Sequence, residues 1–510
     1  MSTPISSRSG STLGSVLQDG AARNPDAAFL CFERKPGLVE TTTWREMAAR
    51  AGSTAGALRD LGVLPGDRVG VHLTNCPEFY DVWFGTALLG AAIVPTNPLS
   101  TVDELRYVHQ HAGCRVVVTE PDLRATVEAA GAGVVVDIQD GWAENGEAGD
   151  SFPFVAADSV AAVLYTSGTT SKPKGVLVTH AAYLNAGDVV AGHLRLRPED
   201  RQLIVLPLFH GNAQYYSTMS ALVTGASIGL APRFTASRWS AQAVALRATV
   251  ASLFAAPIRM ILAHEAATED RAHALRAVLF AQNVSAAQAD AFESRFGVPL
   301  LQLYGMTETV FPPLMNPLYE RRDAASMGRP VAGAQVRLIS AEGHDVAPGE
   351  PGQLIIAGEP GRTVMAAYLG DPVSTEKTLV SGWLHTGDVA RADAEGYLYF
   401  VDRAKDMIKR AGENVSCAEV EGVVNAHPAV FESAAVGVPD EMRDEALIVF
   451  VVVRDGQQVT EEDLIGLCRD RLAKFKVPDA VEFVHDLPRT SVGKIQKHLL
   501  RRRVHEPPTT

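Results

Sequence analysis

A run of hydroxyl, glycine and lysine residues lies between two apolar stretches near residue 170. The segment Tyr165-Thr-Ser-Gly-Thr-Thr-Ser-Lys-Pro-Lys-Gly175 follows the apolar residues 161–164 and precedes a second β-like run at 176–179. Glycines allow a close backbone approach, hydroxyls and exposed amides donate to phosphoryl oxygens, and lysine supplies positive charge. The segment therefore predicts a phosphate-binding loop, with a flexible surface turn as the alternative. The candidate ligands are Thr166, Ser167, Gly168, Thr169, Thr170 and Lys174.

The spacing within this loop differs from that of the Walker A loop of nucleoside triphosphatases. The pattern G-x-x-x-x-G-K-[ST] does not occur in the segment, and a strand is expected after it where the Walker loop has a helix. We therefore expect a triphosphate site of another kind.

The order of residues in the loop resembles the signature of the adenylate-forming superfamily. This family includes acyl-CoA synthetases, firefly luciferase and the adenylation domains of peptide synthetases. Further segments resemble motifs of the same family from about residue 43 to the basic C-terminal stretch. The resemblance implies an AMP-forming acid–thiol ligase that uses ATP and Mg²⁺ to convert a carboxylic acid to an acyl-adenylate. Pyrophosphate leaves, and the acyl group passes to coenzyme A with release of AMP.

The segment Leu303-Tyr-Gly-Met-Thr-Glu-Thr309 resembles a family motif that binds the nucleotide. The resemblance implies that Tyr304 stacks on adenine, Thr307 binds the α-phosphate and Glu308 holds Mg²⁺, with Thr166 as a second metal ligand. An aromatic face, a hydroxyl and a hard carboxylate oxygen suit these tasks.

Two later segments resemble the motifs that bind ribose. They are Trp383-Leu-His-Thr-Gly-Asp388 and Val401-Asp-Arg-Ala-Lys-Asp406. The resemblance implies that Asp388 accepts hydrogen bonds from both ribose hydroxyls and that Arg403 also reaches the ribose. A carboxylate has enough acceptor sites for two hydroxyl groups.

The C-terminal stretch carries two further motifs. Ile408-Lys-Arg-Ala-Gly-Glu-Asn-Val415 resembles the loop that builds the tunnel for the thiol acceptor, which places Lys409 and Gly412 at the coenzyme A site. Pro488-Arg-Thr-Ser-Val-Gly-Lys494 resembles the terminal motif, whose lysine bridges the substrate carboxylate and the α-phosphate. The resemblance thus makes Lys494 a catalytic residue and places a hinge at Lys405, about which the small C-terminal domain rotates between the two half-reactions.

The expected acyl pocket is polar. Leu206-Pro-Leu-Phe-His-Gly-Asn-Ala-Gln214 resembles the motif whose histidine lies by this pocket, so His210 is implied there as a pocket or gate residue. It is not expected to bind metal, because no further ligands follow at metal spacing.

Phe280-Ala-Gln-Asn283 stands where the family has small residues beside adenine and substrate, so Ala281 and Gln282 are implied to contact both. With Asn212 and Gln214 nearby, a long alkyl chain would leave amides unpaired at roughly 1 to 3 kcal/mol each. We expect a short, polar or aromatic acid. In the alternative, Gln282 and Asn283 bond to the local backbone.

The elements that must position these motifs alternate between helix and strand from about residue 43. A capping box, Thr43-Trp-Arg-Glu46, predicts a helix start, and a second one begins at Thr101. Strands separated by helices imply mostly parallel sheets covered by helices. The expected strands are 68–73, 91–94, 115–119 and 134–136.

After about residue 327 the pattern changes to short β-like stretches separated by glycines, and then to a compact α+β arrangement. In the latter we expect helices at 418–426 and 461–474 and a strand at 446–453. The sequence therefore predicts an α/β fold with two domains. The large N-terminal domain spans 1–403, with a β-barrel-like part at about 328–402, and a mobile C-terminal domain spans 404–510.

Composition narrows the function classes further. With 510 residues the chain is expected to form more than one domain, and its formal net charge of −13 argues against a non-specific nucleic-acid binder. Its five cysteines form no C-x-x-C pair, which indicates a reducing compartment. The apolar stretches are too short to span a bilayer. We expect a cytoplasmic monomer or homodimer without a membrane span.

Two other functions stay open at this point. One is an adenylate-forming enzyme whose acceptor is a carrier-protein thiol or an amine, or one that activates a small inorganic acid such as nitrite. The other is an inactive binding homologue, which would lack a catalytic residue. The residues that argue against the second are all present: Lys174, Glu308, Asp388, Arg403 and Lys494.

Overall fold

A computed structural model describes most of the chain, which divides into two compact units. The first unit is made of 1–166, 173–336 and 356–385, and the second of 167–172, 337–355 and 386–510. The described residues are 10–143, 152–166, 172–403, 406–410, 413–440, 444–489 and 495–505.

The first unit contains a six-stranded sheet whose central strands are parallel. Its buried residues are largely valine, as expected for strands covered on both faces. The last strand, β8, runs antiparallel to β7, and this hairpin carries the predicted phosphate loop. In sheet order the strands are β6 (Val134–Asp137), β5 (Val116–Thr119), β3 (Arg68–His72), β4 (Ala92–Pro95), β7 (Val160–Thr166) and β8 (Lys174–Thr179).

A second, nine-stranded sheet completes the first unit. Its strands are parallel from β13 to β1, and antiparallel strands cover its two edges. The carboxyl ends of β11, β12 and β13 carry Phe254, Ala281 and Tyr304. The order is β15 (Arg329–Pro330), β14 (Leu314–Met315), β13 (Leu300–Tyr304), β12 (Ala277–Ala281), β11 (Val250–Phe254), β9 (Arg201–Ile204), β10 (Ser227–Leu230), β1 (Ala28–Lys35) and β2 (Leu38–Thr43).

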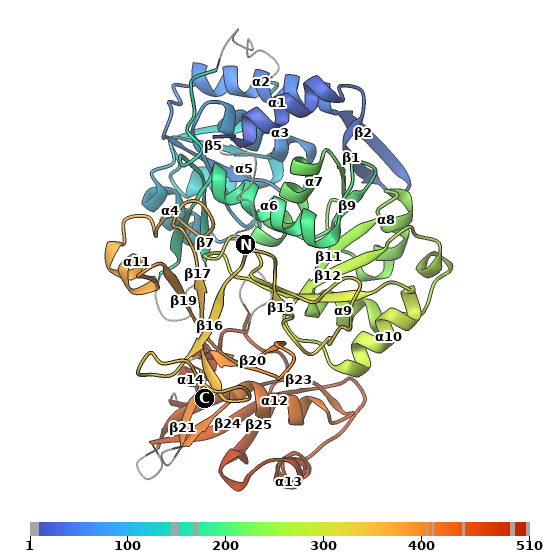
Figure 1. The fold of residues 1–510 in the computed structure, drawn as a ribbon, viewed down its shortest axis with the longest axis vertical. Coiled ribbons are helices and arrows are strands. Elements are labelled where there is room, and N and C mark those ends of the chain that lie inside the picture. The colour runs from blue at the N-terminus through green and yellow to red at the C-terminus, as the bar shows by residue number, and fades with distance from the viewer. Residues whose placement is uncertain are drawn as a thin grey trace. The chain divides into compact units, whose positions relative to one another are not determined.

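Helices that carry aromatic side chains pack against the two sheets of the first unit. Figure 1 shows α1, α2 and α3 side by side, and α3 contacts β3 and β4 while α7 contacts β10. Trp83 of α3 lies 5.5 Å from Tyr183 of α6, which lies 5.4 Å from Tyr215, centroid to centroid. The helices are α1 (Leu13–Arg23), α2 (Trp44–Asp60), α3 (Pro77–Leu88), α6 (His180–Leu194), the π-helix η1 (Asn212–Thr218) and α7 (Met219–Thr224).

The capping boxes predicted at Thr43 and Thr101 are both present and open α2 and α4. A separate apolar cluster, which includes Trp239 and Phe292, joins α8, α9 and α10 to the nine-stranded sheet. These remaining helices are α4 (Val102–Ala112), α5 (Pro121–Ala129), α8 (Trp239–Ala245), α9 (Ala255–Leu262), α10 (Ala286–Phe296) and α11 (Pro372–Thr378).

The short strands predicted after residue 328 form a five-stranded sheet. Its order is β16-β17-β19-β18, and β20 pairs with β19. The strands are β16 (Val336–Ile339), β17 (Pro351–Ala357), β18 (Leu379–Val380), β19 (Trp383–Ala392) and β20 (Leu398–Arg403).

The C-terminal part of the second unit is α+β, as predicted. Alternate residues of β24 face two apolar clusters: Leu447 and Val449 pack with α12 and α13, and Ile448 and Phe450 pack with Leu500 of α14. The elements are β21 (Ile408–Arg410), β22 (Glu413–Val415), α12 (Cys417–Asn425), β23 (Val430–Asp440), β24 (Asp444–Val453), α13 (Glu461–Arg471), β25 (Ala480–Phe483) and α14 (Lys497–His505).

One helix is shorter than predicted. The expected helix at 461–474 ends at Arg471, because Leu472 has extended backbone with φ −121° and ψ 155°. A separate 3₁₀ turn, Lys474–Lys476, follows, and Pro478 disfavours helical backbone at Val477. Within the described ranges, no helix is both long and apolar enough to cross a membrane.

Candidate active site

The β7–β8 hairpin positions the ends of the predicted phosphate loop. Thr166 pairs with Lys174 and Tyr165 pairs with Gly175 in the antiparallel register. The prediction that a strand follows the loop is therefore correct. Residues 167–171, which include the predicted ligands Ser167, Gly168, Thr169 and Thr170, lie outside the described part of the chain.

Side chains from α4 brace this hairpin. The Tyr107 hydroxyl donates to the carbonyl of Pro173 at 2.9 Å, and the Tyr165 hydroxyl lies 2.7 Å from His111 Nδ1. The ring centroids of Tyr107 and His111 stack at 5.4 Å. Both ends of the loop are thus tied to one helix.

Lys174 is held by groups near the start of α11. Its ammonium donates to Ser374 Oγ at 2.6 Å and lies 3.9 Å from Asp371 Oδ2. It also lies 4.8 Å from the ring centroid of Tyr368, within range of a cation–π interaction. Asp371 caps α11 by accepting from the Ser374 amide at 2.9 Å. The lysine is therefore bound by protein groups in this structure.

Glu308 lies in the turn that follows β13 and is 7% exposed. Its Oε1 accepts a hydrogen bond of 2.8 Å from the Tyr368 hydroxyl, and its carbonyl accepts from the Met365 amide at 2.9 Å. Burial, and then the charge of Glu308, raises the pKa of Tyr368, so this phenol is a stable donor at neutral pH. Among the described residues, no hydrogen bond to Glu308 Oε2 is formed.

The turn around Glu308 is tightly packed. Thr309 Oγ1 accepts from the Met306 amide at 3.0 Å, and the Thr307 carbonyl accepts from the Tyr215 hydroxyl at 3.3 Å. A Cβ on Gly305 would lie 2.3 Å from the Tyr216 hydroxyl, so only glycine fits beside that buried ring. Tyr304 precedes the turn at the end of β13, 9% exposed.

His210 lies just before η1, beside two aromatic rings. Its ring centroid is 4.5 Å from that of Phe209 and 6.3 Å from that of Phe254 at the end of β11. Asn212, two residues on, is 6% exposed, and its Nδ2 has no hydrogen-bond partner among the described residues. A buried amide without an acceptor is costly, which suits a position filled by a polar ligand.

The expectation that Gln214 makes the pocket polar is not supported. Gln214 is fully buried, its Nε2 donates to the Leu208 carbonyl at 2.7 Å, and its Oε1 accepts from the Tyr183 hydroxyl. Both ends of this amide are therefore used in the helical core, where the Tyr183 hydroxyl would otherwise be unpaired.

The segment after β12 has an unusual backbone. Gln282 has φ +73°, which costs a non-glycine residue roughly 1 to 2 kcal/mol, and its side chain is exposed. Asn283 Oδ1 accepts from Gln302 Nε2 at 2.8 Å, so this side chain is engaged locally, by a neighbouring strand rather than by backbone. Ala281 is half-buried at the end of β12.

In the second unit, the two predicted ribose ligands lie opposite each other on neighbouring strands. Asp388 of β19 pairs with Arg403 of β20, and Arg403 Nε lies 3.0 Å from Asp388 Oδ1. Asp388 is 3% exposed. Lys409 is exposed on β21, and its amide donates to Glu445 Oε2 at 2.7 Å. The predicted hinge residue Lys405, the predicted coenzyme A residue Gly412 and the predicted catalytic residue Lys494 lie outside the described residues.

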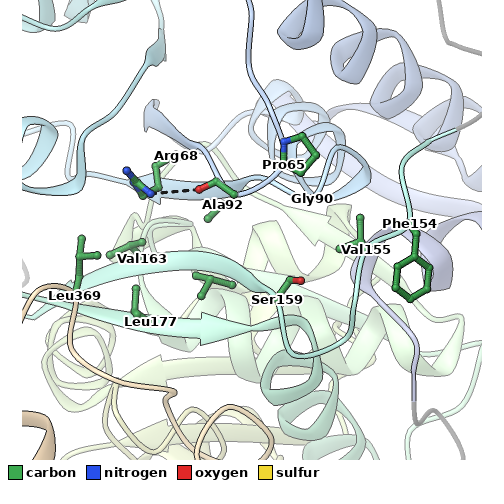
Figure 2. Close-up of a pocket in the computed structure, with 12 residues that line it drawn as sticks. Pro65, Arg68, Gly90, Ala92, Phe154, Val155, Ser159, Val163, Leu177 and Leu369 are labelled. Atoms are coloured by element: carbon green, nitrogen blue, oxygen red, sulfur yellow. Dashed lines mark hydrogen bonds between the residues drawn. The ribbon is translucent and has the colours of Figure 1, made fainter. Parts of the chain in front are cut away.

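A separate cavity of about 360 Å³ lies in the first unit and contains none of the predicted site residues. Figure 2 shows Arg68 at one end of it and Phe154 with Val155 at the other. The guanidinium of Arg68 donates to the carbonyls of Ala112 and Gly66, and the other lining side chains are mostly apolar. Arg68 is thus engaged by backbone carbonyls, and the mostly apolar lining does not favour a phosphate site here.

Comparisons with known proteins agree with this architecture. The model of the family described as AMP-binding enzyme matches residues 17–369, and that of the AMP-binding enzyme C-terminal domain matches 419–494. The chain is 35% identical over 512 residues to a crotonobetaine/carnitine–CoA ligase of Citrobacter koseri, covering 96% of this chain and 99% of the relative.

Two solved structures have similar folds. ATP-bound MatB from Rhodopseudomonas palustris has a TM-score of 0.88 at 26% identity, with 97% of this chain and 99% of that chain covered. The anthranilate CoA ligase AuaEII in complex with anthranoyl-AMP has a TM-score of 0.88 at 26% identity, with 98% of each chain covered.

The chain belongs to the AMP-binding enzymes. Within that family, the relative of Citrobacter koseri is named a crotonobetaine/carnitine–CoA ligase and AuaEII an anthranilate CoA ligase, which confirms the predicted activity class of an AMP-forming acid–thiol ligase. The predicted α/β fold, with a large N-terminal part and a small α+β C-terminal part, is also confirmed.

Proposed function

We propose that this chain activates a short polar or aromatic carboxylic acid with ATP and transfers the acyl group to coenzyme A. The observation that carries the proposal is the cluster formed by Lys174, Tyr368 and Glu308 beside the phosphate-loop hairpin. It brings a cation and a buried carboxylate, 134 positions apart in sequence numbering, into contact with one tyrosine. The MatB structure with ATP and the AuaEII structure with anthranoyl-AMP support a nucleotide site in this fold.

The reaction needs charge neutralisation more than covalent chemistry. A carboxylate oxygen attacks the α-phosphorus of ATP, the bond to pyrophosphate breaks, and a mixed anhydride forms. Negative charge therefore grows on the phosphorus oxygens and on the leaving group. Loss of one preorganised donor to such charge typically costs about 10²- to 10³-fold in rate.

We assign the predicted site residues to roles in this reaction. Thr307 donates to the α-phosphate, Tyr304 stacks on adenine, and Asp388 with Arg403 holds the ribose. Glu308 and Thr166 would hold Mg²⁺, which when bound supplies positive charge to the phosphates. The buried Glu308 fits a hard cation, since Tyr368 fixes one carboxylate oxygen and leaves the other for a ligand.

The loop residues Ser167, Gly168, Thr169 and Thr170 are proposed to bind phosphates, with Lys174 adding charge next to them. Lys494 bridges the carboxylate and the α-phosphate, while Lys409 and Gly412 serve coenzyme A. We further propose the domain boundary at 403/404, the hinge at Lys405, and a cytoplasmic monomer or homodimer.

The test of the Lys494 role separates the two half-reactions. We expect Lys494→Ala to abolish acid-dependent ATP–pyrophosphate exchange and to retain thioester formation from supplied acyl-adenylate and coenzyme A. Exchange at the wild-type rate in this variant would contradict the assigned role.

Asn212 supports the preference for a polar acid. Its buried Nδ2 lacks an acceptor among the described residues and is two positions from His210, the proposed pocket residue. We propose that an acid with a hydroxyl or carbonyl oxygen supplies this acceptor. The names of relatives point the same way, because crotonobetaine, carnitine and anthranilate are short polar or aromatic acids.

The pocket is tested by the Asn212→Leu variant. We expect kcat/KM for a hydroxy or oxo acid to fall by about 10- to 100-fold, since a lost hydrogen bond at a buried site costs about 1 to 3 kcal/mol. For an unsubstituted acid of the same chain length, kcat/KM should rise or stay constant. An equal loss for both acids would mean that Asn212 does not select the substrate.

A further inference from the structure

Tyr368 lies at the centre of the cluster, although it is not among the residues assigned above to bind the nucleotide, the acid or coenzyme A. Its hydroxyl donates to Glu308 Oε1 at 2.8 Å, and the face of its ring lies 4.8 Å from the Lys174 ammonium. One side chain thus contacts both the proposed metal ligand and the lysine at the end of the phosphate loop.

The backbone of Tyr368 is fixed independently of these contacts. It forms an antiparallel bridge with Val176 of β8, and its amide donates to Thr375 Oγ1 at 3.0 Å. The neighbouring Leu369 amide donates to the Gly175 carbonyl at 2.7 Å. The tyrosine is therefore attached to the strand that leaves the phosphate loop, and it is 8% exposed.

Glu308 is fixed to the same segment by its main chain. The Met365 amide donates to the Glu308 carbonyl at 2.9 Å, three residues before Tyr368. The carboxylate could still rotate about its side-chain bonds, and the hydrogen bond from the tyrosine removes that freedom. Hydrogen bonds to ligating carboxylates orient the ligand and tune the metal site.

We propose that Tyr368 is a positioning residue that holds the Glu308 carboxylate in the orientation required to bind the divalent cation of the nucleotide complex. The inference rests on the proposed function of Glu308. The role of Tyr368 links the lysine at the end of the phosphate loop to the metal ligand, because the Lys174 ammonium lies over the same ring. The hydroxyl orients the carboxylate, and the ring restrains the lysine.

Two variants distinguish the contribution of the Tyr368 hydroxyl from that of its ring. Tyr368→Phe removes only the hydroxyl, so the contact with Lys174 remains and Glu308 loses its donor. Tyr368→Leu removes both. The matched control is Tyr399→Phe, since the Tyr399 hydroxyl donates to Asp393 Oδ2 at 3.0 Å in a hydrogen bond of the same type elsewhere in the chain.

The measured quantity is the affinity for Mn²⁺ of the full-length enzyme, in the presence of ATP and the absence of acid. Loss of the free Mn²⁺ signal in electron paramagnetic resonance reports binding, with a titration of ATP alone subtracted. We expect Tyr368→Phe to weaken Mn²⁺ binding by about 10- to 100-fold, the usual effect of losing a partner of a metal ligand. The Mg²⁺ concentration for half-maximal pyrophosphate exchange should rise in parallel, and the KM for the acid should not.

Tyr399→Phe should leave both quantities unchanged, and thermal melting without metal should show that all variants are folded. Wild-type Mn²⁺ affinity in folded Tyr368→Phe would overturn the inference. The Glu308→Gln variant distinguishes a wrong role for Tyr368 from a wrong role for Glu308 in the proposed function. If Glu308→Gln weakens Mn²⁺ binding and Tyr368→Phe does not, only the role of Tyr368 is wrong. If neither does, Glu308 is not the metal ligand.

Discussion

His72 on β3 and His109 on α4 are buried, with 0% and 4% exposure, and predict a specific acid sensitivity of the fold. His72 Nδ1 lies 2.8 Å from Thr96 Oγ1, while neither ring nitrogen of His109 has a hydrogen-bond partner among the described residues. Burial lowers the pKa of each imidazole to about 4, and the charge of His109 further lowers that of His72.

The free energy of unfolding falls with pH because the unfolded chain binds more protons than the folded chain. Between pH 6.5 and about 4 the unfolded chain binds protons at these histidines and the folded chain does not. Acid therefore destabilises the fold, with most of the effect below the ordinary pKa of histidine. From pH 7.5 to 5.5, each histidine removes about 1.3 kcal/mol from the free energy of unfolding.

The perturbation is His109→Leu, which removes one imidazole without breaking a hydrogen bond to a described residue. Urea denaturation followed by tryptophan fluorescence at pH 7.5 and 5.5 gives the loss of unfolding free energy for each protein. We expect the loss in the variant to be smaller by about 1.3 kcal/mol. His264→Leu, at an exposed position, is the control and should retain the wild-type loss. An unchanged loss in His109→Leu would refute the reasoning.

Three other substitutions test the packing of the site and of the second unit. Gly305→Ala places a Cβ 2.3 Å from the Tyr216 hydroxyl, and displacement of the turn by about 1 Å should lower the pyrophosphate-exchange rate about 10²-fold in a folded protein. Gln214→Leu leaves the Tyr183 hydroxyl without its acceptor and should lower unfolding free energy by about 1 to 3 kcal/mol in urea denaturation. Lys497→Met removes the cation beside the partly buried Glu421, which keeps only the Ala435 amide as a donor, and should lower the stability of the second unit by about 1 to 3 kcal/mol. Limited proteolysis measures this loss, and adding Glu421→Gln should restore much of it.

The sequence predicts the framework well because its signals are local. The capping boxes at Thr43 and Thr101 can each be recognised from four residues, and the continuous apolar run of β24 lies within one ten-residue strand. The helix predicted at 461–474 is too long by three residues, because no glycine or proline marks its end at Arg471, where Leu472 becomes extended.

The hydrogen-bond and ion-pair partners of the site residues come from segments distant in sequence, so no local sequence pattern predicts them. Tyr368, Ser374 and Asp371 reach Lys174 only because β8 pairs with the segment around Tyr368. Gln214 is a polar residue whose predicted role was not supported. Its place in a pocket motif predicts a polar pocket wall, but its amide forms hydrogen bonds to the Tyr183 hydroxyl and the Leu208 carbonyl. A polar residue type does not reveal whether its partner is a ligand or the core.

The most direct test of the central claim is AMP formation by the purified enzyme with ATP, Mg²⁺ and a panel of short carboxylic acids, with and without coenzyme A. Mass spectrometry identifies the acyl product. We predict AMP release that requires both the acid and coenzyme A and yields one acyl-CoA thioester per AMP. AMP release that proceeds equally without coenzyme A and yields no thioester would contradict the account.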